Sequence, residues 1–397
     1  MTWALPLALS DAVRDWLDLG LRWLHVIAAM AWIGTSFYFV LLDQSLRAPK
    51  DAADAEAGVG GELWEVHGGG FYHVQKYVVA PRVLPEHLAW FKWEAYTTWL
   101  SGFALMLVLY YFEASSALVK PGDDLEPWLA VTISIGLLVV AWIVYDVLNR
   151  LVSDPRVLWP VLIVLVALAA WGSSELFSPR AAWLQVGAMI GTVMAANVFF
   201  VIIPAHWELI RAKEAGREPD PRPGIQAKQR SVHNNYLTLP VLLTMLAGHF
   251  PFAYGADHAW LVLVGLMAIG AWVRLFYNLR HTGVTHWWMA VAAAAAFVAI
   301  AVVVERGDET TAAPADAAAI ALGKSVFAEA GCGGCHTLAD AGTSGTVGPS
   351  LDAAKPSASL VTERVTNGLG GMPPFAGSLS GEEIAAVAAY VATAARG

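Results

Sequence analysis

Cysteine occurs only twice in this chain of 397 residues, at Cys332 and Cys335. The two stand in Cys332-Gly333-Gly334-Cys335-His336, which has the C-x-x-C-H spacing of a c-type haem attachment site. Two thiols on one helical turn reach the two vinyl groups of one porphyrin, and the adjacent imidazole then lies beneath the iron. A redox dithiol is the alternative. We expect one haem c bound covalently to Cys332 and Cys335, with His336 as a ligand of its iron.

Residues after His336 include a candidate second iron ligand and a hydrogen-bond acceptor for the His336 ring. Met372 is the one methionine that follows, and a thioether opposite an imidazole raises the potential of the iron and marks an electron carrier. A carbonyl of Gly348-Pro349 can accept a hydrogen bond from the second nitrogen of His336, as metal-bound histidines usually require. With helical spacing over 319–329 and 382–394, the layout resembles the small class I monohaem cytochrome c domains over 317–397.

A second stretch has a composition that suits a flat, polar, anionic ligand. Residues 68–77 read Gly-Gly-Gly-Phe-Tyr-His-Val-Gln-Lys-Tyr, in which aromatic and amide groups alternate with basic ones. Aromatic rings stack, Gln donates and accepts hydrogen bonds, and Lys neutralises negative charge. We therefore take Tyr72, Gln75 and Lys76 as candidate substrate-binding residues. The alternative is an interfacial segment with Trp and Lys side chains at the level of the lipid headgroups.

A third stretch, Arg230-Ser231-Val232-His233-Asn234-Asn235-Tyr236, leads directly into an apolar run. Consecutive polar groups at a membrane entry are costly unless a ligand or a cavity satisfies them. Arg230, Asn234, Asn235 and Tyr236 are further candidates for substrate binding. His233, Asn234, Asn235 and Lys76 are candidates for catalysis, without distinct roles; for the Asn pair, a helix cap is the alternative.

Two histidines lie in apolar runs, His25 in the first run and His249 near the end of the sixth. Facing imidazoles across a helix bundle can hold a b-type haem, and electrons that cross the membrane must travel about 30 Å through hydrocarbon. We expect His25 and His249 to be iron ligands of a haem b. His206, His281 and His286 are placed to hold a second haem or to act as acid or base. The alternatives are a helix-to-helix hydrogen bond for His25 and an interfacial site for His249.

The elements that position these residues are predicted to be membrane helices. The chain is 57% hydrophobic and 14% charged, whereas charged residues make up about a quarter of soluble domains. Its 18 Trp residues suit the two membrane interfaces. We count eight apolar runs long enough to cross a membrane, with seven as the alternative. They span about 16–42, 95–113, 127–149, 157–173, 181–205, 236–252, 259–279 and 286–304.

The loop charges predict the orientation of these spans. Lys and Arg are concentrated in the connections after the first, third, fifth and seventh runs, which places those connections in the cytoplasm. Both termini then lie on the periplasmic side of the bacterial inner membrane, where covalent haem attachment takes place. We expect a membrane domain at 1–304, a linker at 305–318 and a monohaem cytochrome c domain at 319–397. The fold class is all-α, an eight-helix transmembrane bundle with a small cytochrome.

Three long motifs precede the cytochrome domain: residues 68–77, residues 90–96 with Trp99-Leu100-Ser101-Gly102 after them, and Val-His-Asn-Asn-Tyr-Leu-Thr-Leu-Pro-Val at 232–241. In these motifs the chain is similar to the bacterial integral-membrane urate oxidase family, over nearly its whole length. The resemblance implies oxidation of urate to 5-hydroxyisourate, with electrons passing through the fused cytochrome to the respiratory chain and no hydrogen peroxide formed. It assigns no substrate-binding residues.

The expected partners are urate, the lipid bilayer and a periplasmic cytochrome c or terminal oxidase that accepts the electrons. A net charge of −9 argues against a nucleic-acid partner, and the sequence makes no prediction of the oligomeric state. Two other functions stay open at this point: a quinol-oxidising, cytochrome-bearing respiratory subunit, and a non-enzymatic membrane anchor that passes electrons from a docked catalytic partner.

Overall fold

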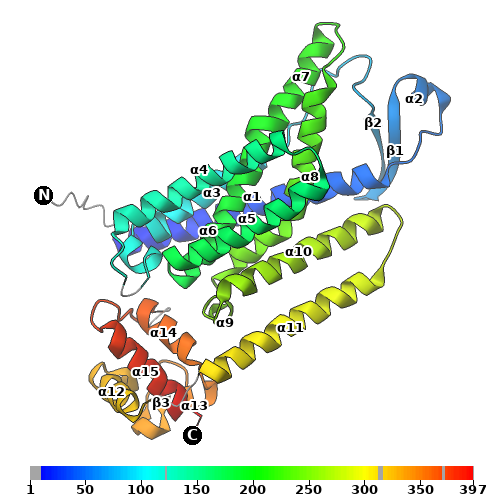
Figure 1. The fold of residues 1–397 in the computed structure, drawn as a ribbon. Helices are drawn as coiled ribbons and strands as arrows, with labels where there is room; N and C mark the ends of the chain where they lie inside the picture. The colour runs from blue at the N-terminus through cyan, green and yellow to red at the C-terminus, as the bar shows by residue number, and fades with distance from the viewer. Residues whose placement is uncertain (1–9, 121–122, 312–315, 369–371, 397) are drawn as a thin grey trace, which may run out of the picture.

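The computed structural model describes residues 10–120, 123–311, 316–368 and 372–396. Long helices form a bundle, and a small helical domain lies at one end of it (Figure 1). Apolar residues cover most sides of the long helices, as expected where the surrounding solvent is lipid and every backbone group is paired within a helix. The prediction of an all-α transmembrane bundle with a small C-terminal domain is confirmed.

Proline and short polar residues determine where many of these helices begin. Pro127, Pro155, Pro179 and Pro221 each occupy the first helical position, where a missing N–H costs nothing. The helices of the membrane domain are α1 (Asp11–Ser45), α2 (Ala52–Glu56), α3 (Trp93–Met106), α4 (Pro127–Leu151), α5 (Pro155–Leu176), α6 (Pro179–Ala196), α7 (Ile203–Glu214), α8 (Pro221–Ala247), α9 (Pro251–Tyr254), α10 (Ala259–His281) and α11 (Trp287–Thr311).

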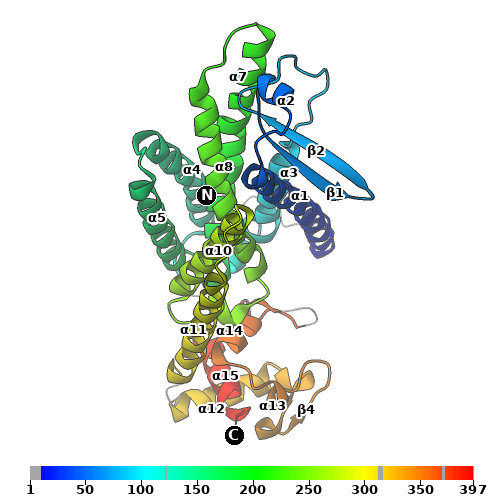
Figure 2. The ribbon, with the colours of Figure 1, turned by 90° about the vertical axis from the view of Figure 1, so that its right-hand side faces the viewer.

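Within the described part of the chain, six helical segments are long and apolar enough to cross a membrane. They correspond to six of the eight predicted runs. The run predicted at 95–113 is most of α3 followed by the π-helical segment η1 (Leu107–Tyr111), and a second π-helical segment, η2 (Ala114–Leu118), comes directly after the run. The run predicted at 236–252 is the second half of α8, whose first half is polar. Figure 2 shows α8 and α10 in the middle of the bundle, with α4 and α5 on one side and α1 and α3 on the other.

The connections between helices gather at two opposite ends of the bundle (Figure 1). The first turn of α1 lies at the same end as the C-terminal domain, and Arg14 there donates to Glu113 at 3.2 Å. The loops that follow α1, α4, α7 and α10 lie at the other end. A helix joins α6 to α7 without a break through the π-helical segment η3 (Asn197–Ile202). Because the start of α1 and the C-terminal domain lie at the same end, the chain passes along the bundle an even number of times.

A β-hairpin, which the sequence did not predict, extends from the end that carries the basic loops. It pairs β1 (Val59–His67) with β2 (Gly70–Tyr77) in antiparallel register. Gly68 and Gly69 form its two-residue turn with φ of 56° and 84°, values that favour glycine. The buried Glu62 anchors the hairpin, because its carboxylate accepts from the Lys50 N–H at 3.1 Å and contacts His73 at 2.9 Å.

The C-terminal domain encloses its own core. Phe327, Leu338 and Tyr390 are buried there together with Ile384, Val387 and Val391 on one face of the last helix. α11 continues to Thr311, inside the predicted linker, and the domain begins with α12 at Ala317. Its elements are α12 (Ala317–Glu329), the 3-10 turn η4 (Cys332–Gly334), β3 (Thr337–Leu338), the 3-10 turn η5 (Ala339–Ala341), β4 (Thr343–Ser344), α13 (Leu351–Ala354), α14 (Ala358–Asn367) and α15 (Gly381–Ala394).

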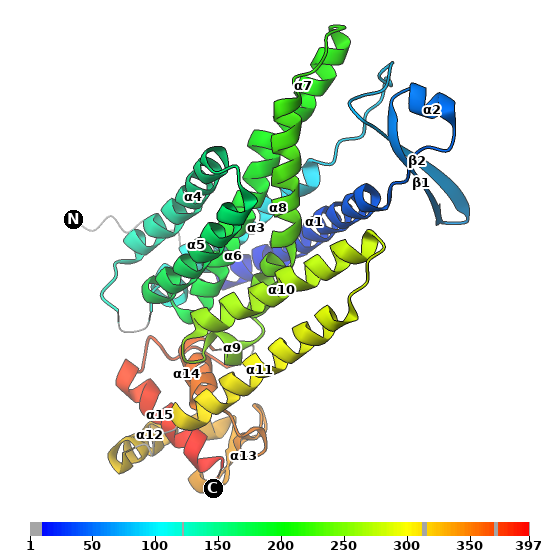
Figure 3. The same ribbon diagram turned by 45° about the vertical axis from the view of Figure 1, so that its right-hand side comes forward.

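The small domain is docked on the bundle through α14 and α9 (Figure 3). The Tyr254 hydroxyl donates to Oε1 of Glu363 at 3.1 Å, and a Cβ placed on Gly255 would lie 3.7 Å from Cβ of Ser359. Tyr254 is only 3% exposed. Burial, with the nearby Glu363 carboxylate, raises the pKa of Tyr254, so its hydroxyl stays a donor at all physiological pH values.

Candidate functional site

The C-x-x-C-H segment folds as a compact turn directly after α12. Cys332 and Cys335 enclose η4, and the His336 N–H donates to the Cys332 carbonyl oxygen at 3.0 Å. The two cysteines do not form a disulfide, and Cys332 is half-buried while Cys335 is exposed. Burial raises the pKa of the Cys332 thiol. The turn therefore presents two thiols and one imidazole within a single short segment.

The surroundings of His336 match those of a metal-bound histidine. Its Nδ1 lies 2.9 Å from the Pro349 carbonyl oxygen, which is the hydrogen bond predicted from the sequence. The bond leaves Nε2 free for a metal. A Cβ at Gly348 would overlap the His336 ring, so glycine is required for this approach. Met372, half-buried, packs against the same core as Cys332. These residues fit a haem c, which Cys332 and Cys335 would hold covalently and whose iron His336 and Met372 would bind.

Within the membrane domain, the polar residues of α8 are buried on two different faces of that helix. Successive residues of an α-helix point about 100° apart, so three consecutive side chains spread over more than half of the helix circumference. His233 and Asn234 contact α4 and η3, whereas Asn235 contacts α10. All three are at most 6% exposed. The predicted cluster is therefore buried as expected, but its side chains take part in two separate contacts, one with α4 and η3 and one with α10.

The contact with α4 is a hydrogen-bond network. Arg230 Nη2 donates to Asp146 Oδ1 at 2.7 Å, which neutralises the charge of this arginine. The Tyr145 hydroxyl lies 2.8 Å from His233 Nδ1 and accepts from Asn197 Nδ2 at 3.2 Å. Because Asn197 donates to that oxygen, we assign the hydroxyl proton to the bond with Nδ1, so a neutral His233 carries its own proton on Nε2. His233 thus retains one free N–H donor.

The contact with α10 contains a buried cation that the sequence reasoning missed. Arg274 is 3% exposed, and its Nε donates to the side-chain oxygen of Asn235. The guanidinium carbon lies 3.8 Å from the ring centroid of Phe37 on α1. No carboxylate of the described residues forms an ion pair with it. Its position inside the predicted apolar run 259–279 could have identified Arg274 from the sequence, because charged residues within membrane spans usually have a function.

Several buried polar atoms near these contacts have no hydrogen-bond partner among the described residues. One N–H group of each arginine is unpartnered, Nη1 of Arg230 and Nη2 of Arg274. Side-chain oxygens of Asn149, Asn197 and Asn278 are unpartnered as well. Leaving a buried donor or acceptor unsatisfied costs about 1–3 kcal/mol. This concentration of unpartnered donors and acceptors marks the region as one that can receive a polar ligand.

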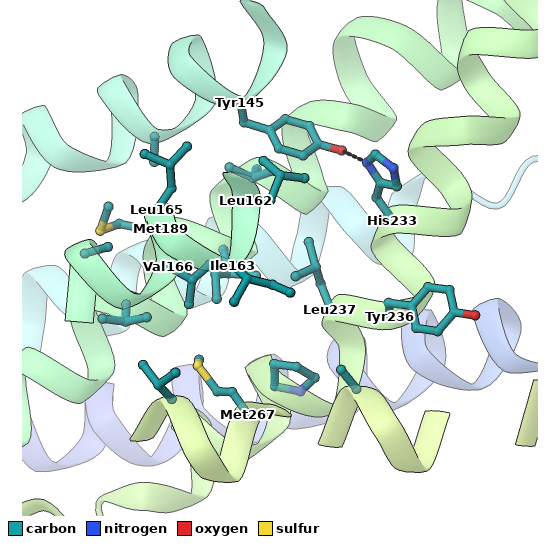
Figure 4. A pocket seen from close by; sticks show the side chains of 18 of the residues that line it. Tyr145, Leu162, Ile163, Leu165, Val166, Met189, His233, Tyr236, Leu237 and Met267 are labelled. Carbon is teal, nitrogen blue, oxygen red and sulfur yellow. Dashed lines mark hydrogen bonds between the residues drawn. The ribbon is translucent and has the colours of Figure 1, made fainter. Parts of the chain in front are cut away.

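A cavity of about 600 Å³ lies beside the network, between α4, α5, α6, α8 and α10 (Figure 4). Its lining is almost wholly apolar, and Leu162, Ile163 and Met267 are typical of it. The hydrogen-bonded pair of Tyr145 and His233 forms its polar end, as Figure 4 shows. No lining residue carries a carboxylate, an ammonium or a guanidinium.

The hairpin residues predicted to bind substrate are not brought to this network. Tyr72 is 53% exposed, and Gln75 donates to Asp54 at 2.8 Å within the same extramembrane region. Lys76 pairs with Asp43 at the end of α1. Lys228 of α8 lies 3.6 Å from the same Asp43 carboxylate, so the hairpin is tied to the polar half of α8. Their role in substrate binding stays a prediction.

The two histidines predicted to bind haem b have separate surroundings. His25 Nδ1 lies 3.0 Å from the Thr98 carbonyl oxygen and 3.1 Å from the Ser101 hydroxyl, and its ring packs on Gly102 of α3. This is the helix-to-helix hydrogen bond considered as the alternative. His249 is exposed beyond the end of α8. The structure thus gives no support to a haem between them.

Two family models match the chain. The model described as "Urate oxidase N-terminal" matches residues 11–305, and the model described as "Cytochrome C oxidase, cbb3-type, subunit III" matches residues 318–391. Cytochrome c6 of Tetradesmus obliquus is 40% identical over 88 residues, which are 20% of this chain and 93% of that protein. Cytochrome c6 of Picosynechococcus sp. is 40% identical over 94 residues, 20% of this chain and 76% of that protein.

Among solved structures, the c-type cytochrome SorU from Sinorhizobium meliloti is 51% identical, over 19% of this chain and 91% of that chain, with a TM-score of 0.19. The sequence matches support a haem c in the C-terminal domain and a cytochrome-linked oxidoreductase; they give no support to a haem b. The first of these family models spans the bundle from the start of α1 to residue 305, within α11. The chain belongs to the family of membrane proteins that carry the urate oxidase N-terminal domain, with a cytochrome c domain at its C-terminus.

Proposed function

We propose that this protein oxidises urate to 5-hydroxyisourate at the buried polar region of α8 and α10 and delivers the electrons to its own haem c. Oxidation of urate with one water releases two electrons and two protons. A haem c held by Cys332, Cys335, His336 and Met372 would supply a one-electron acceptor for them. They then pass to a periplasmic cytochrome c or a terminal oxidase, and no hydrogen peroxide is formed because dioxygen is not the direct acceptor.

Arg274 is the observation that carries this proposal. A buried guanidinium without a carboxylate partner is costly, by several kcal/mol per ion in a low-dielectric interior. A bound anion would offset that cost, and urate is a planar anion at neutral pH. The free Nη2 of Arg274 and the amide of Asn235 can hydrogen-bond the edge of such a ring, and Phe37 keeps the guanidinium in place. The unpartnered Asn278 oxygen on the same helix can accept a ring N–H.

We assign the handling of protons to His233, which lies two residues before Asn235 and therefore on the other face of α8, the face that contacts α4. Its Nδ1 is engaged with Tyr145, so Nε2 is the nitrogen that can exchange a proton. Arg230 is neutralised by Asp146 and serves mainly to hold the network together. We therefore assign anion binding to the α10 contact and proton transfer to the α4 contact.

The arrangement of charges supports an inner-membrane location with substrate entering from the cytoplasm. Loop Lys and Arg residues are concentrated at the end of the bundle opposite to the cytochrome domain. That orientation places the cytochrome domain and the start of α1 in the periplasm. The oxidation site lies about two helical turns from the cytoplasmic end of α10, since Arg274 is seven residues from His281.

The test is anaerobic addition of urate to the purified full-length protein. We expect the absorption bands of reduced haem c to appear, in a two-to-one ratio of electrons to urate consumed. The Cys335→Ala variant should bind urate but show no such bands from a correctly attached haem. Formation of hydrogen peroxide from urate in air, at the same rate in the native protein and in Cys335→Ala, would overturn the proposal.

A further inference from the structure

The cavity between α4, α5, α6, α8 and α10 has a lining that does not suit urate. Urate is anionic, and no cationic side chain reaches the cavity wall. Haem is equally unsuited, because its two propionates need charged or polar partners that this lining lacks. The cavity nevertheless has a size, about 600 Å³, within the range of small-molecule sites. Its natural occupant is therefore apolar, uncharged and able to accept or donate a few hydrogen bonds.

The polar end of the cavity supplies those hydrogen bonds. In the tautomer assigned above, His233 Nδ1 accepts from Tyr145 and Nε2–H is the remaining donor. Trp159 packs edge-on against the His233 ring with centroids 4.7 Å apart. A neutral donor of this kind suits a carbonyl oxygen. It does not suit a phospholipid headgroup, which carries charge and belongs at the interface rather than in the middle of the bundle.

The cavity also opens between α4 and α5 toward the outer surface of the bundle. Three lining residues on α4 and α5 are also exposed on the outer surface of the bundle, Val140 at 52%, Val144 at 37% and Ile163 at 59%. An apolar tail can therefore leave the cavity sideways into the hydrocarbon core. A ring with carbonyl groups at the polar end and an isoprenoid tail in the bilayer is the structure of a membrane quinone.

We propose that the cavity binds an isoprenoid quinone, which carries electrons from the oxidation site to haem c. This inference rests on the proposed function for the source of its electrons. Quinone takes up two electrons and two protons, those released from urate and water, and becomes quinol. Quinol would then give up its two electrons one at a time to the single haem c, which its electron acceptor would reoxidise between the two steps, and would return to quinone with release of two protons. The quinone would thus divide a two-electron oxidation into one-electron steps and shorten the crossing of about 30 Å.

Ala268 and Ala295 provide a matched pair of variants for the test. Both alanines are exposed, but only Ala268, on α10, lines the cavity, whereas Ala295 lies on the outer side of α11. Phe at position 268 fills space that the quinone ring or tail needs, whereas Phe at position 295 adds the same volume to the outer surface. Neither residue belongs to the proposed urate contacts. Both proteins should retain haem c, which the absorption spectrum of the full-length protein checks.

The experiment measures quinone in organic extracts of the purified protein, by the absorbance change on borohydride reduction, and follows haem c reduction by decylubiquinol without urate. We expect native protein and Ala295→Phe to contain quinone and to be reduced by decylubiquinol, and Ala268→Phe to lose both by at least about tenfold. Equal quinone in the two variants, extracts that hold phospholipid alone, or haem reduction by urate at full rate in quinone-depleted protein would overturn the inference. Haem reduction by decylubiquinol but not by urate would overturn the proposed function and leave the quinone site standing.

Discussion

The side chain of Arg274 is held in place by two neighbouring residues. The guanidinium is held on one side by the ring of Phe37 and on another by the amide of Asn235, and one of its N–H groups is left free. A residue fixed in this way loses little freedom when it binds a ligand. Arginine and lysine are not interchangeable in such a setting, because only the planar fork can serve Asn235 and an anion together.

The first prediction concerns this residue. Arg274→Lys should raise the KM for urate by about tenfold or more, and Arg274→Gln should raise it further, because a charge-assisted hydrogen bond contributes about 1.5–3 kcal/mol. Urate-dependent reduction of haem c measures both. Arg280→Ala, at an exposed position of the same helix, is the control and should leave the KM unchanged. Equal KM values for native protein and Arg274→Gln would contradict an anion site here.

The second prediction concerns Gly348. Alanine at this position would overlap the ring of His336, so either the ring or the segment that carries Pro349 must shift. Gly348→Ala should therefore lower the amount of correctly attached haem c and change its absorption spectrum and midpoint potential. Gly377→Ala is the matched control, because a Cβ there meets nothing within 4 Å. Identical spectra and potentials in the two variants would show that the overlap is relieved without consequence.

Sequence spacing predicted the haem residues because their chemistry is local. Cys332, Cys335 and His336 act within five residues, so the pattern alone defines the site, and the bond from His336 to Pro349 needs only a short loop. The membrane site is different. Asn234 and Asn235 are adjacent in sequence but face η3 and α10, and Arg274 reaches Asn235 from 39 residues away. Such contacts depend on how the helices pack against one another, which the amino-acid sequence alone does not show.

The same distinction holds for whole elements. Most helices could be predicted from apolar runs and their proline starts, but the hairpin of β1 and β2 could not be recognised among them. The alternation of aromatic, amide and basic groups over 68–77 suited a ligand, yet it is also the period-two alternation of a strand. In the structure Tyr72 pairs with Glu65 across the two strands, and His73 pairs with Trp64. The rings of His73 and Trp64 stack with their centroids 4.2 Å apart. Cross-strand pairing accounts for much of that composition.

The third prediction concerns the packing of α12 against α15 in the cytochrome domain. The Tyr390 hydroxyl donates to Asp340 Oδ2 at 2.7 Å and Lys324 Nζ lies 2.9 Å from the same atom, so these bonds lower the pKa of Asp340. A carboxyl whose folded pKa is lowered stabilises the fold above its unfolded pKa of about 4, and the stabilisation is lost as pH falls through the folded value.

Asp340→Asn should accordingly destabilise the domain at neutral pH and make its unfolding less dependent on pH in the acid range. Haem c absorbance during acid titration of the full-length protein reports this transition. Glu382→Gln, at an exposed position of α15, should titrate like the native protein. An unchanged acid transition in Asp340→Asn would mean that the ion pair with Lys324 is screened by solvent, as many exposed pairs are.

At the scale of the whole molecule, the contact between α14 and α9 fixes the position of the cytochrome domain relative to the bundle. Tyr254→Phe removes the hydroxyl that donates to Glu363 and keeps the buried ring, so the apolar contact remains. A net loss of about 1 kcal/mol should let the cytochrome domain leave its docked position more often.

The fourth prediction is therefore slower reduction of haem c by urate in Tyr254→Phe, by a few-fold, with unchanged reduction by ascorbate. Stopped-flow absorbance measures both rates. Tyr277→Phe, on the exposed side of α10, is the control. A parallel fall in the two rates would point to a damaged haem site instead of altered docking.

The fifth prediction tests the direction of electron flow across the bilayer. The structure places the start of α1 and the cytochrome domain at one end of the bundle and the loop between α7 and α8 at the other. With Lys and Arg concentrated at the second end, a protease added to intact spheroplasts should remove a tag from the C-terminus and leave a tag inserted at Gly216 uncut. Inverted vesicles should give the opposite result. If the C-terminal tag is cut only in inverted vesicles, haem c faces the cytoplasm, urate and haem lie on the same side, and neither a crossing of the membrane nor a quinone in its centre is needed.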